Sequence, residues 1–142
     1  MNNPEFAKPL SVLIADDELV VLKMLSDKFA RAGFTVWSVT DGQTALELVR
    51  AQKSHLIVLD WMMPGMDGLA ACRAIKDDER LMATPVIILT ARGEDADVAR
   101  ARGAKADMVV VKPISLREFL ERARQLITAV EARTESVTGR GL

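Results

Sequence analysis

The sequence predicts an α/β fold, in which a parallel sheet of five strands is covered by helices on both faces. Two patterns support this fold: five short runs rich in Val, Ile and Leu recur along the chain, and segments with helical spacing of apolar residues separate them. The runs are continuous rather than alternating, which is typical of strands buried on both faces. Alternation of strands and helices over short connections favours right-handed crossovers and excludes all-helical and all-β folds.

The five predicted strands share an aliphatic composition and are each followed by polar or turn-forming residues. They are Ser11 to Ala15, Phe34 to Val39, Leu56 to Leu59, Val86 to Leu89 and Met108 to Val111. Each is short enough to be a strand rather than a buried helix.

Four of the intervening segments have the apolar spacing of amphipathic helices. The first runs from about Leu22 to Ala32, with Gly33 as its C-terminal cap. The second begins at Asp41, which offers N-cap chemistry. The apolar stripes of the second, third and last helices are Ala45, Leu46 and Val49; Leu69, Cys72 and Ile75; and Leu116, Phe119, Leu120, Ala123, Ile127 and Val130.

The fourth helical segment, about Asp95 to Arg102, differs from the others. Its apolar residues are one valine and three alanines, set among four charged residues. Such a helix can bury little surface. We therefore expect it to be the least stable element and the one most easily moved.

Composition and charge limit the possible functions. A chain of 142 residues, 49% hydrophobic and 27% charged, fits one globular domain. We place this domain at residues 10–131. Residues 1–9 would be an N-terminal extension, and residues 132–142 a flexible C-terminal tail or truncated linker. The net charge of −1 provides no field that would recruit nucleic acid or an anionic membrane. Cys72 is the only cysteine, and neither a signal peptide nor a transmembrane run is visible, so we expect a cytoplasmic protein.

Polar residues follow four of the predicted strands, and these carry the functional prediction. They are Asp16 and Asp17 after the first strand, Asp60 after the third, Thr90 after the fourth, and Lys112 with Pro113 after the fifth. The carboxyl ends of parallel strands meet at one edge of a sheet, where ligands bind. Two carboxylates about 4 Å apart repel by roughly 4 kcal/mol at an effective dielectric constant of about 20, so this cluster requires a cation.

The chemistry of these residues suits phosphoryl transfer. All the candidate ligands are hard oxygens, which favour Mg²⁺ or Mn²⁺ over zinc. Lys112 supplies a positive charge and Thr90 a hydroxyl donor, and both suit a phosphoryl group. Asp60 would be the nucleophile.

The joint pattern resembles the receiver domain of bacterial two-component response regulators, over roughly Leu10 to Val130. It consists of Asp16-Asp17, Asp60 with the following M-P-G-M-D-G, Thr90-Ala91 and Lys112-Pro113. The resemblance implies a flavodoxin-like three-layer fold with strand order 2-1-3-4-5. It also implies that Asp60 takes a phosphoryl group from the phosphohistidine of a sensor histidine kinase or a histidine phosphotransfer protein.

Further residue roles follow from the resemblance alone. Mg²⁺ would be held by Asp17, Asp60 and the backbone carbonyl of Met62, with Asp16 nearby or acting through water. Thr90 and Ala91 would contact the phosphoryl group and take part in switching, Lys112 would pair with that group, and the Lys112-Pro113 bond would be cis. The surface that changes on phosphorylation would lie around the fourth helix, fifth strand and fifth helix. A downstream protein would bind it, or two copies of an otherwise monomeric protein would pair through it when phosphorylated.

Two positions depart from the family pattern. Val109 stands where a tyrosine or phenylalanine often takes part in the switch, and the chain has no tyrosine. Met62 stands two residues after Asp60 and cannot orient an attacking water by hydrogen bonding, so we expect a long-lived acyl phosphate.

The first helix has more apolar residues than one buried stripe requires. Leu19, Val20 and Met24, with Ile114 near the fifth helix, are candidates for docking a kinase helix bundle, although a wide buried face would also explain them.

The sequence is also compatible with other kinds of protein. The chain could be a single-domain regulator, or the receiver part of a larger regulator or hybrid kinase. A haloacid-dehalogenase-like phosphatase would need an acidic residue where Met62 stands, and a flavodoxin would need a phosphate loop without the acidic residues of Ala15 to Glu18. No helix-turn-helix follows the last helix, so we expect no binding of nucleic acid by these residues, and no enzymatic activity beyond the protein's own phosphorylation and dephosphorylation.

Overall fold

The computed structural model describes residues 9–140, with side-chain detail as far as residue 133. Its sheet has five parallel strands in the order β2-β1-β3-β4-β5. Their bounds are β1 (Ser11–Ala15), β2 (Thr35–Val39), β3 (Leu56–Asp60), β4 (Val86–Thr90) and β5 (Met108–Val111). The predicted strand order is confirmed. The N-terminal extension that we expected at residues 1–9 lies outside the described residues except for its last position.

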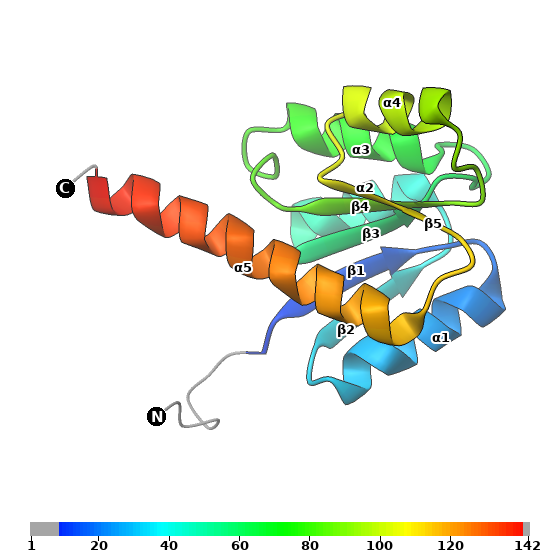
Figure 1. The fold of residues 1–142 in the computed structure, drawn as a ribbon, viewed down its shortest axis with the longest axis horizontal. Helices are drawn as coiled ribbons and strands as arrows, with labels where there is room; N and C mark the ends of the chain where they lie inside the picture. Colours follow the sequence, from blue (N-terminus) through cyan, green and yellow to red (C-terminus); the bar gives the residue numbers. More distant parts are fainter. Residues whose placement is uncertain (1–8, 141–142) are drawn as a thin grey trace.

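Helices cover both faces of the sheet, which confirms the three-layer prediction (Figure 1). The helices are α1 (Leu19–Arg31), α2 (Gly42–Ala51), α3 (Gly68–Asp77), α4 (Asp95–Gly103) and α5 (Leu116–Arg140). Side chains of α1 and α5 pack in the hydrophobic cluster on one face, and those of α2, α3 and α4 in the cluster on the other.

Successive residues of the central strands point alternately into the two hydrophobic clusters, because side chains alternate between the two faces of a strand. In β1, Val12 and Ile14 pack toward α1 and α5, whereas Leu13 and Ala15 pack toward α2 and α3. All residues of β1, β3 and β4 are buried, whereas the edge strands β2 and β5 are partly exposed. The prediction of burial on both faces is therefore confirmed for β1, β3 and β4. It is wrong for β2 and β5, because each has a neighbouring strand on one side only.

Short polar side chains fix where two of the helices begin. The Asp41 carboxylate accepts a hydrogen bond from the Thr44 N–H at the start of α2, at 2.7 Å, as predicted. Asp67 does the same for α3, accepting from the Ala70 N–H at 2.8 Å. Gly33 has a φ of 95°, the left-handed conformation that a residue just after a helix commonly adopts.

The last helix differs from the prediction. We expected a flexible tail or truncated linker at 132–142. The backbone is helical as far as Arg140, and residues 141–142 lie outside the described range. Each residue added to an existing helix closes one hydrogen bond without a new nucleation step, and this stretch holds no proline to stop it. Figure 1 shows the end of α5 projecting past the sheet.

α4 confirms the expectation that it buries little surface, because Ala101 is its only buried residue. α1 begins at Leu19, and Leu22 is its first buried residue, as predicted for the apolar stripe. The residues before Leu22 are largely exposed. Among the described residues, no helix has an apolar stretch long enough to cross a membrane.

Candidate functional site

Three aspartates meet at the carboxyl ends of β1 and β3. Asp60 is the last residue of β3, and Asp16 and Asp17 directly follow β1. One carboxylate oxygen from each lies within 4.8 Å of the others. Asp16 is fully buried and the Asp60 side chain is 6% exposed, whereas Asp17 is exposed. The structure therefore brings together the three carboxylates that the sequence placed at this edge.

Backbone contacts hold Asp60 in place. The N–H of the next residue, Trp61, donates to the Leu89 carbonyl of β4 at 2.8 Å, and its carbonyl accepts from the Gly68 N–H at 2.9 Å. A Cβ at Gly68 would lie only 2.2 Å from the Asp60 carbonyl oxygen. The start of α3 thus packs directly against the end of β3, and only glycine allows this close approach.

Lys112 is the cation at this cluster. Its Nζ lies 2.8 Å from Asp60 Oδ1, 3.5 Å from Asp16 Oδ2 and 3.5 Å from Glu18 Oε1. The bond between Lys112 and Pro113 is cis, in agreement with the resemblance. Glu18 is a partner of Lys112 beyond those expected from the sequence, and its position directly after the two aspartates is the pattern that indicates it.

The burial of these carboxylates is costly when they are charged. Burial raises the pKa of Asp60 to about 6; the hydrogen bond from Lys112 opposes this rise, and the negative charges of Asp16 and Asp17 add to it. Burial also raises the pKa of Asp16. Burial lowers the pKa of Lys112, but its hydrogen bond to Asp60 and the nearby carboxylates outweigh that effect, so its pKa is raised overall. One lysine therefore does not neutralise the cluster.

These donors suit a hard divalent cation. All three side chains offer carboxylate oxygens, and no histidine or cysteine belongs to the group. Mg²⁺ is commonly bound through one or two carboxylates, keeps several waters, and leaves positions for phosphate oxygens. The convergence of three carboxylates within 4.8 Å, two of them buried, fits such an ion.

Thr90 and Ala91 lie at the end of β4, next to this cluster of carboxylates. Thr90 is 2% exposed, and its hydroxyl accepts a hydrogen bond from the Arg92 N–H at 2.9 Å. The Lys112 N–H donates to the Thr90 carbonyl at 2.7 Å, which fixes the end of β5 beside the end of β4. Val109, at the position that often carries an aromatic residue, is partly buried against the cluster on the α2, α3 and α4 face.

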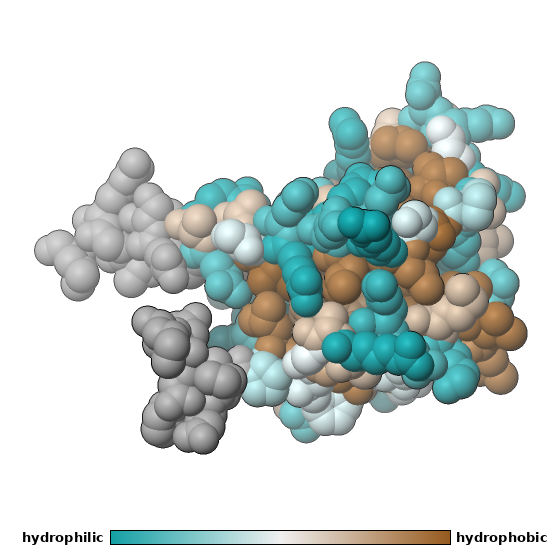
Figure 2. Space-filling model, turned by 60° about the horizontal axis from the view of Figure 1, so that its bottom comes forward, coloured by the Kyte–Doolittle hydropathy of each residue, from teal (hydrophilic) through white to brown (hydrophobic). Residues whose placement is uncertain are grey.

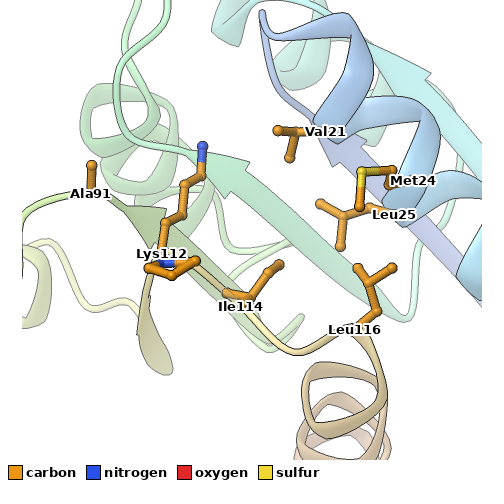
Figure 3. A pocket seen from close by; sticks show the side chains of 8 residues that line it. Val21, Met24, Leu25, Ala91, Lys112, Ile114 and Leu116 are labelled. Atoms are coloured by element: carbon orange, nitrogen blue, oxygen red, sulfur yellow. The ribbon is translucent and has the colours of Figure 1, made fainter.

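An apolar cavity of about 460 Å³ lies beside Lys112, between α1 and the start of α5 (Figure 3). It is lined by Val21, Met24, Leu25, Ala91, Lys112, Pro113, Ile114 and Leu116. Two of the four docking candidates, Met24 and Ile114, form part of its wall. The other two, Leu19 and Val20, are 69% and 73% exposed and are not among its lining residues. Figure 2 shows hydrophobic surface at the right-hand edge of the molecule, where Figure 1 places the start of α1.

Met62 and Trp61 follow Asp60 in the loop toward α3. The Met62 side chain is 60% exposed, whereas Trp61 is 5% exposed. The Arg100 guanidinium carbon of α4 lies 5.3 Å from the centroid of the Trp61 ring, in the range of a cation–π contact. The sequence alone did not indicate this contact, since no local pattern links Arg100 to Trp61.

Comparisons with known proteins agree on one family. The model of the response regulator receiver domain matches residues 12–124. The transcriptional regulatory protein AfsQ1 of Streptomyces coelicolor is 38% identical over 82% of this chain and 51% of its own length. The phosphate regulon transcriptional regulatory protein PhoB of Pseudomonas aeruginosa is 33% identical over the same shares of the two chains. This chain thus spans about half the length of these curated relatives.

A solved structure is similar as well. The signal receiver domain of a signal transduction histidine kinase from Syntrophus aciditrophicus has a TM-score of 0.79 and 29% sequence identity, over 84% of this chain and 91% of that one. Relatives of this chain thus include a receiver domain of a kinase as well as transcriptional regulators.

Proposed function

Because the chain belongs to the response regulator receiver family, we propose that Asp60 accepts a phosphoryl group from the phosphohistidine of a sensor histidine kinase or a histidine phosphotransfer protein. One observation carries the proposal: the buried Asp60 carboxylate lies 2.8 Å from Lys112 Nζ and within 4.8 Å of two further carboxylates. We expect this reaction to take place in the cytoplasm. The chemistry is confined to the domain's own phosphorylation and dephosphorylation.

Asp60 is the nucleophile of the proposed reaction. One of its carboxylate oxygens attacks phosphorus, the bond between phosphorus and the imidazole nitrogen breaks, and the imidazole leaves with its proton. The attack requires the ionised carboxylate, which predominates above the Asp60 pKa of about 6. Lys112 holds Oδ1 of Asp60 and stabilises the charge that builds up on the phosphoryl oxygens.

Asp17 and Asp60, the backbone carbonyl of Met62, and Asp16 nearby or through water would hold Mg²⁺, or Mn²⁺ in its place. When bound, the ion offsets the negative charge of the carboxylates and of the phosphoryl oxygens. The exposed position of Asp17 leaves that side of the cluster open to the incoming group, while the buried Asp16 fixes the Lys112 ammonium from the other side.

Thr90 links the phosphoryl group to the rest of the domain. In the described structure its hydroxyl accepts from the Arg92 N–H, in the loop that leads to α4. If the hydroxyl turns to donate to a phosphoryl oxygen, that bond is lost and the loop and α4 are released. The outcome is a changed surface around α4, β5 and α5, which a downstream protein would read or through which two copies would pair.

The cavity beside Lys112 and the exposed apolar residues of α1 are the proposed docking surface for the phosphate donor. The wall of the cavity comes from α1 and from the segment between β5 and α5, and it adjoins the Lys112 that contacts Asp60. A helix seated there would bring its phosphohistidine to Asp60. This proposal holds both for a receiver that acts alone and for one that is part of a longer regulator or hybrid kinase.

Phosphorylation by a small donor tests the function directly. The protein is incubated with acetyl phosphate, with and without Mg²⁺, and intact and peptide mass spectra are recorded. We expect one phosphoryl adduct on Asp60 that requires Mg²⁺, no adduct in Asp60→Asn, and normal labelling in the matched control Asp67→Asn, whose side chain caps α3. An unlabelled wild type, or labelling that persists in Asp60→Asn, would contradict the proposal.

A further inference from the structure

We propose that the contact between Arg100 and Trp61 holds α4 in its unphosphorylated arrangement and is lost when Asp60 is phosphorylated. This inference rests on the proposed function, which it extends by naming the residue pair that restrains the movable helix. The pair joins the helix with the least buried surface to the residue that directly follows the phosphoacceptor.

α4 has few attachments, so a single contact can decide its position. Its only buried residue is Ala101, next to Arg100. The Arg100 side chain is 59% exposed, and its Nη1 lies 3.9 Å from Asp97 Oδ1 one turn earlier. The central carbon of the same guanidinium lies 5.3 Å from the Trp61 ring centroid.

Trp61 is a fixed partner for this arginine. Its backbone is bonded on one side to Leu89 of β4 and on the other to Gly68 of α3, and its side chain is 5% exposed. The indole therefore belongs to the rigid part of the domain. If α4 shifts, Arg100 moves relative to the fixed Trp61 ring.

Trp61 is also the aromatic residue best placed for this role. Phe29, Phe34 and Phe119 pack against one another on the α1 and α5 face, away from α4. Among the described residues, the aromatic side chains in the cluster on the α4 face are Trp37 and Trp61, and Trp37 belongs to the distant edge strand β2.

A second bond ties α4 to the same arrangement. The Arg92 N–H donates to the Thr90 hydroxyl at 2.9 Å, and Arg92 belongs to the segment that leads into α4. When the Thr90 hydroxyl turns toward a phosphoryl group, this bond breaks and the N-terminal end of α4 is freed. The helix then keeps the Arg100 contact, the buried Ala101, and the buried Ala104 at its C-terminal end, whose carbonyl accepts from the Cys72 thiol at 3.4 Å. Loss of the Arg100 contact then completes the change.

The expected effect of removing the Arg100 contact follows from the equilibrium between the unphosphorylated and the activated arrangement of α4. A contact made only in the unphosphorylated arrangement opposes activation, so its removal strengthens the binding of a phosphoryl analogue. An exposed cation–π contact is worth about 0.5–1 kcal/mol, which corresponds to a change of about two- to fivefold in the binding midpoint.

The experiment is a beryllofluoride titration in the presence of Mg²⁺, followed by NMR of the α4 amide and Trp61 indole N–H signals. We expect Arg100→Ala to lower the midpoint about two- to fivefold. Arg100→Lys should give an intermediate midpoint, because the lysine ammonium keeps the positive charge but has no planar group to stack on the Trp61 ring. Arg102→Ala is the matched control, since it removes an exposed arginine from the same helix.

The outcomes separate this inference from the proposed function. If the wild type does not respond to beryllofluoride, or responds in the same way as Asp60→Asn, the proposed function fails and the inference fails with it. If the wild type responds but Arg100→Ala has the midpoint of Arg102→Ala or a higher one, only the inference is overturned. Because Arg100 is largely exposed, the variant should remain folded, which its amide spectrum would verify.

Discussion

At the scale of single residues, Met62 sets the expected lifetime of the acyl phosphate. It stands two residues after Asp60, the proposed phosphoacceptor, and is 60% exposed, so it lies at the surface rather than in the core. An attacking water needs a hydrogen-bond partner that orients it toward phosphorus. A thioether is a poor partner of this kind, and a bulky apolar side chain also displaces water from the approach.

We predict that Met62→Asn speeds dephosphorylation several-fold, because the amide can hold the attacking water by hydrogen bonding. The measurement is the decay of the protein labelled on Asp60 by acetyl phosphate, after removal of the donor. Met82→Asn is the control, since it changes another exposed methionine outside the site. Decay in Met62→Asn that is unchanged or slower would count against this role.

The sequence placed the main site residues because their positions depend only on where strands end. Asp16, Asp60, Thr90 and Lys112 each lie at the carboxyl end of a parallel strand, so the fold alone gathers them. The contact between Arg100 and Trp61 was missed for the opposite reason. It depends on the rotation of α4 about its axis and on two side-chain conformations, and a helix without a clear apolar stripe gives no indication of its rotation.

At the scale of the elements, apolar patterns located the strands and helices, and polar contacts set their ends. The strands β3 and β4 each include the polar residue after the aliphatic run, Asp60 and Thr90, because strand pairing continues through them. Phe34 precedes β2 instead of belonging to it, and its N–H bonds back to the Phe29 carbonyl of α1. Such shifts of one residue are decided by hydrogen bonds that composition does not show.

Lys76 is a further feature that sequence periodicity could not reveal. It lies near the end of α3, where a basic residue normally faces solvent. In the structure it is 8% exposed, and its Nζ donates to the Thr84 carbonyl at 2.8 Å and to Asp107 Oδ2 at 2.7 Å. Asp107 also accepts from the Val86 N–H at the start of β4. The buried pair therefore joins the segments before β4 and β5 at the end of the sheet opposite Asp60.

At the scale of the whole molecule, the carboxylate cluster makes folding stability depend on pH. The pKa of Asp60 is about 6 in the folded protein and 3.8 for the ordinary side chain. Between these values the folded state binds more protons than the unfolded state, so the free energy of unfolding falls as the pH rises through this window. Above it, the buried charge destabilises the metal-free protein.

We predict that Asp60→Asn raises the free energy of unfolding at pH 7, without divalent ions, by on the order of 1–3 kcal/mol. The gain should shrink as the pH falls through the Asp60 pKa of about 6, and should be small below the ordinary value of 3.8. Urea unfolding in a chelating buffer across this range measures it, with the exposed Asp77→Asn as the control. A variant no more stable than the wild type at pH 7 would refute the proposed cost of the buried charge.

The most direct test of the account is whether one divalent ion binds among Asp16, Asp17 and Asp60. Isothermal titration with Mg²⁺ at pH 7 should give one site per wild-type chain, and Asp17→Asn should weaken it by more than about tenfold. The same ion should stabilise the wild type by about 2.7 kcal/mol at a hundredfold excess over its Kd. Absence of Mg²⁺ binding by the folded wild type, or equal binding by Asp17→Asn, would contradict the account.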